Sequence, residues 1–197
     1  LPRKLEYGRQ GHARRSPWFH SERRAGDDFR SRSGSDEAKK VLAVIPVSKT
    51  AQRISLSVDD RWVLTADQTK PRLAGIDTKT NEVSNWIELP GRGYGASPTP
   101  DGRWLIVALS SVNKVAAIDL ATMKVAPTMD GPRAPQEVLI RPDGGKAYVS
   151  CDASRQIAVL DVKNWKVQKL IDAGSGADGL AWAVSQRCRT ASSRYTF

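Results

Sequence analysis

The sequence has few of the residues that most often carry catalysis. Its 197 residues include two histidines, His12 and His20, and no histidine follows residue 20. A Ser-His-Asp triad and a histidine-ligated haem or copper are therefore excluded from residues 39–197. The two histidines are eight residues apart and have no cysteine partner, which does not match a zinc site. No phosphate-binding loop of the GxxxxGKS or GxxxxGKT type is present.

Cysteines and long apolar runs are also scarce. Cys151 and Cys188 are too few for a disulfide framework, and whether they are paired is open. We expect Cys151 to pack as a small apolar side chain at the end of a strand. No apolar run approaches the roughly 18 residues of a membrane-spanning helix. The first forty residues lack the apolar core of a signal peptide, and the chain begins with Leu1, which favours a fragment or a processed chain.

The charge is positive but not concentrated. Lys and Arg number 31 against 21 Asp and Glu, a formal net charge of +10 spread over the whole chain. A nucleic-acid interface would need a concentrated basic stripe, so we expect no nucleic-acid partner. Residues 1–38 are rich in Arg and show no periodicity, which predicts a disordered or loosely attached basic arm. A contact of this arm with nucleic acid or anionic lipid is the alternative.

The chain contains a repeat with a fixed interval. Turn sequences beginning at Asp59, Asp101 and Asp143 are 42 residues apart. The same interval separates three other aspartates that end an apolar run, Asp77, Asp119 and Asp161. A valine opens the following run at positions 41, 83, 125 and 167, again every 42 residues. Independent landmarks in one register indicate a repeat architecture.

Each repeat has four runs with strand character. In the third repeat they are Val138–Arg141, Ala147–Cys151, Gln156–Asp161 and Lys166–Asp172. These runs are rich in β-branched residues and alternate in part, and Gly, Pro, Asp, Asn and Ser separate them. Four short antiparallel strands in a repeat of about 40–45 residues are typical of a propeller blade. The predicted fold is therefore all-β, an incomplete β-propeller of four-stranded antiparallel blades with a 42-residue repeat.

The repeat occupies residues 39–183 and contains about three full blades. Val41–Val47 matches the last strand of a preceding blade, and Gly179–Ala183 matches the first strand of a following one. Residues 184–197 match nothing in the repeat and are predicted to be an irregular tail. We expect the terminal blades to expose apolar sheet and to allow self-association. A fragment of a longer protein is the favoured interpretation, ahead of ring completion by several copies or a stable open arc.

The repeats resemble the YVTN-type β-propeller family over roughly residues 39–183. The name-giving strand is Tyr148-Val149-Ser150-Cys151, between a Pro-Asp-Gly turn and a strand that ends in Leu160-Asp161. The first two repeats depart from this pattern, with Leu64-Thr65-Ala66-Asp67 and Ile106-Val107-Ala108-Leu109. The resemblance implies blades of a ring that usually has seven, a bacterial or archaeal origin and an extracytoplasmic setting. It does not specify an activity.

Residues that recur in every blade are expected to be structural. Trp62 and Trp104 follow the first turn of their repeats, and we expect them to pack between blades. The aspartates at 77, 119 and 161 are expected to accept hydrogen bonds from turn amides. The glycine-rich stretch Gly91–Gly95 lies between blades and is weak as a phosphate site.

Residues that differ between blades at equivalent positions are better candidates for function. Propellers bind ligands at the mouth of the central channel, near the start of each innermost strand. The positions there are Arg53, Gly95, Glu137 and Gly179, with the preceding neighbours Gln52, Tyr94, Gln136 and Asp178. The predicted binding residues are Arg53, Tyr94, Gln136, Glu137 and Asp178. Ordinary solvated loop residues are the alternative interpretation.

The sequence therefore favours a non-catalytic propeller segment that acts as a binding scaffold. Its partner would be a protein or a polymer at the channel mouth, and no catalytic residue, metal or cofactor is assigned. The alternative is a fragment of a propeller enzyme, either a lactonase-like hydrolase that uses carboxylates such as Glu137 and Asp178, or the propeller part of a redox enzyme. The absence of histidine from the repeats counts against the redox version.

Overall fold

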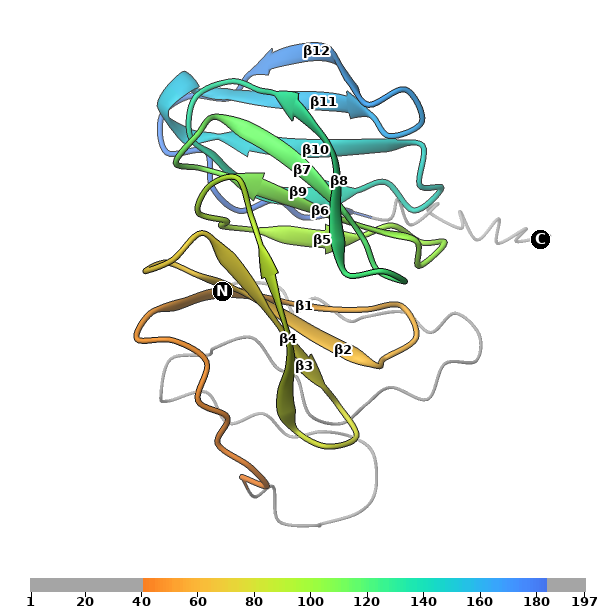
Figure 1. Cartoon of the computed structure of the whole chain (residues 1–197). Coiled ribbons are helices and arrows are strands. Elements are labelled where there is room, and N and C mark those ends of the chain that lie inside the picture. Colours follow the sequence, from red (N-terminus) through yellow and green to blue (C-terminus); the bar gives the residue numbers. More distant parts are fainter. Residues whose placement is uncertain (1–40, 184–197) are drawn as a thin grey trace, which may run out of the picture.

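The computed structural model describes residues 41–183, which form three four-stranded antiparallel sheets side by side (Figure 1). Blade 1 contains β1 (Ala51–Leu56), β2 (Trp62–Asp67), β3 (Arg72–Asp77) and β4 (Glu82–Glu88). Blade 2 contains β5 (Ala96–Pro98), β6 (Trp104–Leu109), β7 (Lys114–Asp119) and β8 (Lys124–Asp130). Blade 3 contains β9 (Pro135–Ile140), β10 (Lys146–Cys151), β11 (Gln156–Asp161) and β12 (Lys166–Asp172), with a short 3-10 helix at Asp152–Ser154.

The predicted fold class is confirmed. In every sheet the strands pair in chain order, so each blade is an up-and-down meander. The last two strands predicted for the third repeat match β11 and β12 at both ends, and the first two differ from β9 and β10 by a few residues. The predicted arm at 1–38, the predicted tail at 184–197 and Cys188 lie outside the described residues.

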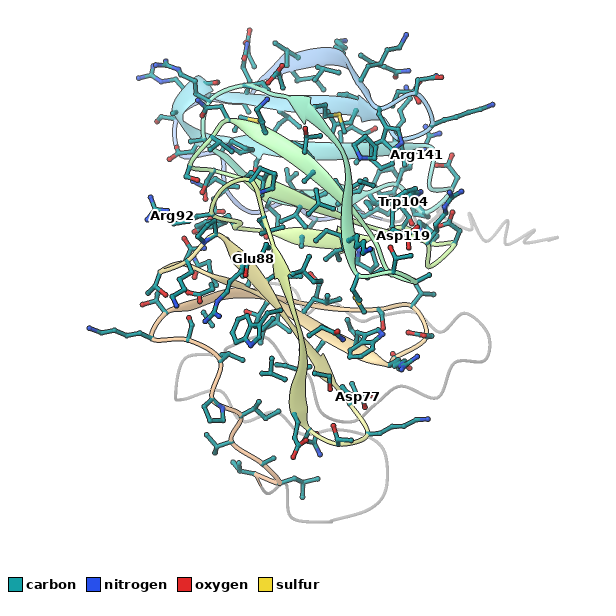
Figure 2. The ribbon with its side chains drawn as sticks, in the orientation of Figure 1. Asp77, Glu88, Arg92, Trp104, Asp119 and Arg141 are labelled. Atoms are coloured by element: carbon teal, nitrogen blue, oxygen red, sulfur yellow. The ribbon has the colours of Figure 1, made fainter. Side chains whose placement is uncertain are left out.

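The recurring aspartates hold the turn between the third and fourth strands. The Asp77 carboxylate accepts a hydrogen bond from the Lys79 N–H at 2.8 Å, and the Asp119 carboxylate accepts one from the Ala121 N–H at 3.0 Å. Asp161 accepts one from the Asn164 N–H at 2.9 Å. Figure 2 shows Asp77 and Asp119 at this position in their blades. The structural role expected for these carboxylates is confirmed.

A hydroxyl group organises the turn between the first two strands of blades 1 and 2. The Ser57 hydroxyl donates to Asp59 at 2.6 Å and accepts from the Trp62 N–H at 2.8 Å. Thr99 makes the same two bonds, to Asp101 and from the Trp104 N–H at 3.0 Å. Blade 3 has Arg141 at this position, and its guanidinium instead donates to Asp143 at 2.7 Å. The turn aspartate therefore accepts a side-chain hydrogen bond in all three blades, from a hydroxyl group in blades 1 and 2 and from a guanidinium in blade 3.

Two apolar cores lie between adjacent blades. The first joins Trp62, Leu64 and Leu73 of blade 1 to a set of blade 2 side chains that includes Leu105 and Ile118. The second joins the opposite face of blade 2 to blade 3, and it contains Ile106, Val115, Val149, Cys151 and Leu160. Alternating residues of β6 thus serve both cores, as the period of a strand requires. Cys151 is fully buried in the second core, as predicted.

The two end segments differ from prediction. Neither Val41–Val47 nor Gly179–Ala183 forms a strand. Backbone N–H and C=O groups need a neighbouring strand to form a ladder, and within residues 41–183 neither segment pairs with one. The Val41 and Val44 side chains are correspondingly exposed, by 80% and 86%.

Bare apolar sheet at the terminal blades was also expected, and the structure agrees in part. In blade 1 the Ile54 and Trp86 side chains are 61% and 38% exposed, whereas Val63 and Ala74 are each only 1% exposed. In blade 3, Leu170 and Ile171 of β12 are 45% and 40% exposed. At the other end, residues 173–183 run beside blade 3, where the Trp182 ring lies 6.4 Å from the Tyr148 ring. Self-association through the terminal blades stays a prediction.

The turn hydroxyl can be tested at Thr99, which is buried. Thr99→Val keeps the shape of the side chain but leaves the Trp104 N–H and the Asp101 carboxylate without this partner. We expect a loss of about 1–3 kcal/mol in the free energy of unfolding, measured by urea denaturation. Thr128→Val on the exposed face of β8 is the control. Equal stability of the two variants would contradict the assigned role.

Candidate functional site

The innermost strands β1, β5 and β9 lie next to one another at the centre of the arc (Figure 1). Hydrogen bonds between blades connect them. The Ser55 hydroxyl donates to the Ala96 carbonyl, and the Gly95 N–H donates to the Gln136 carbonyl at 2.8 Å. Residues that begin these strands are therefore brought together from three different repeats.

Four of the predicted binding residues meet at this place, and we call them the mouth cluster: Arg53, Tyr94, Glu137 and Asp178. The Arg53 Nη2 atom donates to both carboxylate oxygens of Asp178 at 2.8 Å. The Arg53 Nε atom lies 3.5 Å from Glu137 Oε2. The guanidinium carbon is 5.4 Å from the centre of the Tyr94 ring, within cation–π range. Arg53 is thus the group that the other three residues share.

A β-bulge sets the direction of the Arg53 side chain. The register between β1 and β2 shifts between Gln52 and Ile54, so Arg53 is an extra residue in its strand. Its backbone has a φ of 54°, in the left-handed region that a non-glycine residue seldom adopts. Bulges turn side chains out of the regular alternation and are frequent near functional sites. This bulge directs Arg53 toward blade 3 and the segment that follows it.

Glu137 is held against the end of blade 2. A Cβ atom at Gly95 would lie 2.6 Å from the Gln136 carbonyl oxygen and 2.9 Å from Glu137 Oε1, so this close approach requires glycine. The Glu137 N–H donates to the Ser150 hydroxyl at 3.0 Å, and the Val138 N–H donates to the Glu137 carboxylate at 3.2 Å. The Ser150 hydroxyl in turn donates to the Asp178 carbonyl, which links both acidic residues of the mouth cluster.

The electrostatic environments of Glu137 and Arg53 differ. Burial raises the pKa of Glu137, and the nearby Asp178 charge adds to this, while the Val138 N–H and Arg53 oppose it in part. Burial lowers the pKa of Arg53, but the Asp178 and Glu137 carboxylates outweigh that effect and raise it. The Arg53 and Asp178 side chains are 38% and 46% exposed, and Glu137 is 20% exposed. The cluster therefore combines a protected carboxylate with a solvent-accessible ion pair.

Gln136 and Ser150 are the two residues for which the site differs from the sequence prediction. Gln136 contributes its carbonyl to Gly95, and its side-chain Oε1 is buried without a hydrogen-bond partner in the described part of the chain. Gln136 is not part of the ion-pair network. Ser150 was missed by sequence reasoning, although a signal was present: the equivalent residues of the first two repeats are Ala66 and Ala108.

Two kinds of feature are absent from the described residues. Within residues 41–183, no group of three or more His, Cys, Asp or Glu side chains is placed to hold a metal ion. No helix in the same range is long and apolar enough to cross a membrane.

The fold places the chain in a class, that of propeller-like all-β proteins built from four-stranded blades. No family model and no curated protein matches the sequence. Among solved structures, the chain is similar to hydrazine synthase from Kuenenia stuttgartiensis, with a TM-score of 0.61 and 23% sequence identity. The match covers 72% of this chain and 41% of that one, so this chain spans about two fifths of its length. The likeness concerns the fold alone.

The close contact at Gly95 gives a direct test of how the site is assembled. Gly95→Ala would force its new methyl group into the Gln136 carbonyl and the Glu137 carboxylate. We expect a loss of about 1–3 kcal/mol in the free energy of unfolding by urea, as overpacking in tight sites produces. Gly179→Ala is a matched control, because Gly179 is the equivalent residue one repeat beyond Glu137 and a Cβ there would meet nothing within 4 Å. A neutral Gly95→Ala would contradict the contact.

The burial of Glu137 predicts a pH dependence. Its pKa is raised above the ordinary value of 4.5, so its contribution to stability is complete below the unfolded pKa and is lost as pH rises through the folded pKa. Glu137→Gln does not titrate at this position. The variant should therefore become more stable relative to the wild type as pH increases from about 4 to 7 in urea unfolding experiments. Glu88→Gln, at an exposed position on β4, is the control, and the opposite trend at Glu137 would show that the carboxylate is favoured by folding.

Proposed function

We propose that the chain is part of a YVTN-type propeller that binds a partner at the mouth cluster and catalyses no reaction. The Tyr148–Cys151 strand and the 42-residue register of the turns support membership of this family. The partner is a protein or a polymer, and the setting is extracytoplasmic in a bacterium. Both the kind of partner and the setting are inferred from the resemblance of the repeats to this family.

The observation that carries the proposal is the convergence of unlike residues on a constant scaffold. Arg53, Gly95, Glu137 and Gly179 occupy the same position in successive repeats, yet they differ in chemistry. Arg53 faces the Glu137 carboxylate, Gly95 leaves room for Glu137, and Gly179 directly follows Asp178, which binds Arg53. Scaffold positions such as Asp77, Asp119 and Asp161 do not vary in this way. Variation at the mouth of an otherwise repeated scaffold is what a surface adapted to a ligand requires.

The charges of the mouth cluster favour a basic group on the partner. Two carboxylates face one guanidinium, so with Glu137 ionised the cluster has an excess of negative charge. Asp178 is the more accessible carboxylate, and its bond to Arg53 is on the surface, where ion pairs contribute little stability. A lysine or arginine of the partner can therefore share Asp178 with Arg53 at small energetic cost.

Cationic and anionic peptides of equal length test this function. We expect the cationic peptide, titrated into the isotopically labelled chain, to shift the backbone amide resonances of Tyr94, Gly95 and Glu137 in a saturable way. Asp178→Asn should weaken this binding by about tenfold or more, as loss of an interfacial charge contact does. Asp172→Asn removes the same charge from exposed β12 and should leave binding unchanged.

Two results would overturn the proposal. Equal binding of the anionic peptide, or unchanged binding by Asp178→Asn, would remove the mouth cluster as the recognition site. Hydrolysis of a lactone by the purified chain with added divalent cations, lost in Glu137→Gln, would instead establish the enzyme alternative. In that case Glu137 and Asp178 would be catalytic carboxylates.

A further inference from the structure

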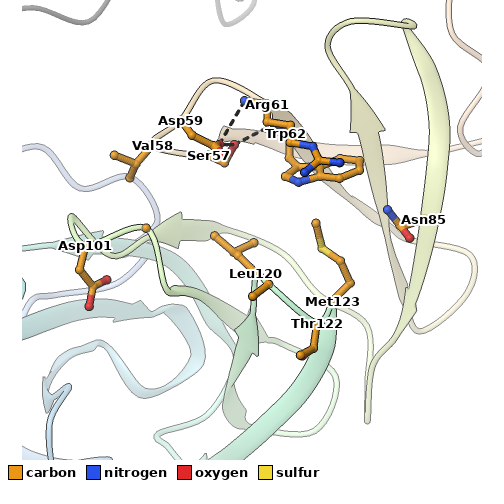
Figure 3. Close-up of a pocket in the computed structure, with 12 residues that line it drawn as sticks. Ser57, Val58, Asp59, Arg61, Trp62, Asn85, Asp101, Leu120, Thr122 and Met123 are labelled. Carbon is orange, nitrogen blue, oxygen red and sulfur yellow. Dashed lines mark hydrogen bonds between the residues drawn. The ribbon is translucent and has the colours of Figure 1, made fainter.

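Two serine hydroxyls at the mouth cross from one structural unit to the next. The Ser55 hydroxyl of β1 donates to the Ala96 carbonyl of β5, and the Ser150 hydroxyl of β10 donates to the Asp178 carbonyl that follows blade 3. At the opposite end of the blades, the Ser57 hydroxyl bonds within its own turn (Figure 3). The mouth hydroxyls therefore join neighbouring units, whereas the turn hydroxyl shapes a single blade.

Between blades 2 and 3 the contact at the mouth is direct. The Gly95 N–H donates to the Gln136 carbonyl at 2.8 Å. A Cβ atom at Gly95 would lie 2.6 Å from that carbonyl oxygen, so the direct bond requires a residue without a side chain. Blade 2 has Ala108 at the position that Ser150 occupies in blade 3. It thus combines glycine at the mouth position with an alanine that has no hydroxyl.

One repeat further on, a relay replaces this direct bond. The equivalents of Gly95 and Gln136 are Glu137 and Asp178. Instead of donating to the Asp178 carbonyl, the Glu137 N–H donates to Ser150 Oγ at 3.0 Å, and that hydroxyl donates to the carbonyl. Because Glu137 has the Cβ atom that Gly95 lacks, the two backbones cannot approach as closely as in blades 2 and 3. The fully buried Ser150 hydroxyl spans the wider gap.

Few contacts hold segment 173–183, which contains Asp178, against blade 3. Beyond residue 173, every hydrogen bond between this segment and the rest of residues 41–183 involves Asp178. One partner is Arg53, in a solvent-exposed ion pair of a kind that contributes little stability. The other partner is the buried Ser150 hydroxyl, and the loss of a buried hydrogen bond leaves its groups unsatisfied. Ser150 is therefore the stronger attachment point of the segment.

We propose that Ser150 is a positioning residue of the mouth cluster: its hydroxyl fixes Asp178 at the separation that the Glu137 side chain requires. Glycine at the mouth position permits a direct bond to the next unit, and a side chain there requires a bridging hydroxyl. This spacing accounts for the pairing of Gly95 with Ala108 and of Glu137 with Ser150. The consequence for ligand binding rests on the proposed function, in which Asp178 is the accessible carboxylate.

The docking of segment 173–183 can be measured without a ligand. The Trp182 and Tyr148 ring centroids are 6.4 Å apart, so the isotopically labelled full chain should show nuclear Overhauser effects between these rings. We expect Ser150→Ala to abolish these effects and to weaken binding of the cationic peptide by about tenfold or more. Ser84→Ala, at an exposed position of β4, is the control and should retain both.

A second substitution separates a bridge from a general loss of stability. Glu137→Gly combined with Ser150→Ala gives blade 3 the residues of blade 2 at both positions, so the direct amide-to-carbonyl bond can form. We expect this double variant to keep the Trp182–Tyr148 effects as fully as Glu137→Gly alone does. The effect of Ser150→Ala should thus depend on residue 137, and this non-additivity is the signature of a spacing role.

Three results bear on the outcome. Persistence of the ring contact in folded Ser150→Ala, or its loss in Glu137→Gly with or without Ser150→Ala, would overturn the proposal. If Ser150→Ala alone does not fold, the comparison of Glu137→Gly with the double variant decides. Absence of peptide binding by the wild type would contradict the proposed function alone, because docking is measured without peptide.

Discussion

Every blade of this protein must bury two faces of a small sheet, and between Ala51 and Asp172 the neighbouring blade supplies most of that burial. Strand β6 is the clearest case, because Leu105 faces blade 1 while Ile106 faces blade 3, and both are fully buried. A sheet of four short strands does not form a core alone, so stability in a repeat protein resides at the interfaces between units. The 42-residue interval in the sequence gives each blade an equivalent surface, so that successive blades can stack in the same way.

This dependence explains which parts of the structure the sequence predicts. Strand positions follow from turns whose chemistry is local: Asp77, Asp119 and Asp161 bind amides two or three residues away. The members of the mouth cluster can also be predicted from the sequence. The 42-residue repeat places equivalent residues of successive blades at the same end of the innermost strands. The bulge at Arg53 does not follow, since a single extra residue leaves the periodicity of β1 nearly unchanged. The end segments do not form the predicted strands because a strand needs a partner as well as a suitable composition. Val41–Val47 has a strand's composition but lacks a partner strand among the described residues.

Differences between repeats therefore carry more information here than similarities. Ser150 replaces alanine where it joins Glu137 to Asp178. Asp67 is a second case, because the equivalent residues of the other two repeats are Leu109 and Cys151. Burial raises the pKa of its carboxyl, yet hydrogen bonds from Thr69 and Arg72 outweigh this and hold the pKa well below its usual range. The turn that follows Asp67 contains Pro71, whose ring prevents the left-handed backbone conformation of the equivalent residues Asn113 and Arg155. In blade 1 the hydrogen bonds to the Asp67 carboxylate hold this turn instead.

The ion pair between Arg53 and Asp178 joins residues 125 positions apart in the chain. Most other stabilising contacts are made within one blade or between consecutive blades, so they can form in order as the polypeptide leaves the ribosome. This contact cannot form until all three sheets have been synthesised and docked, because both partners are needed at once. It is consequently among the last interactions of folding. The mouth cluster is therefore complete only when the arc is assembled, because Arg53 belongs to blade 1 and Asp178 follows blade 3.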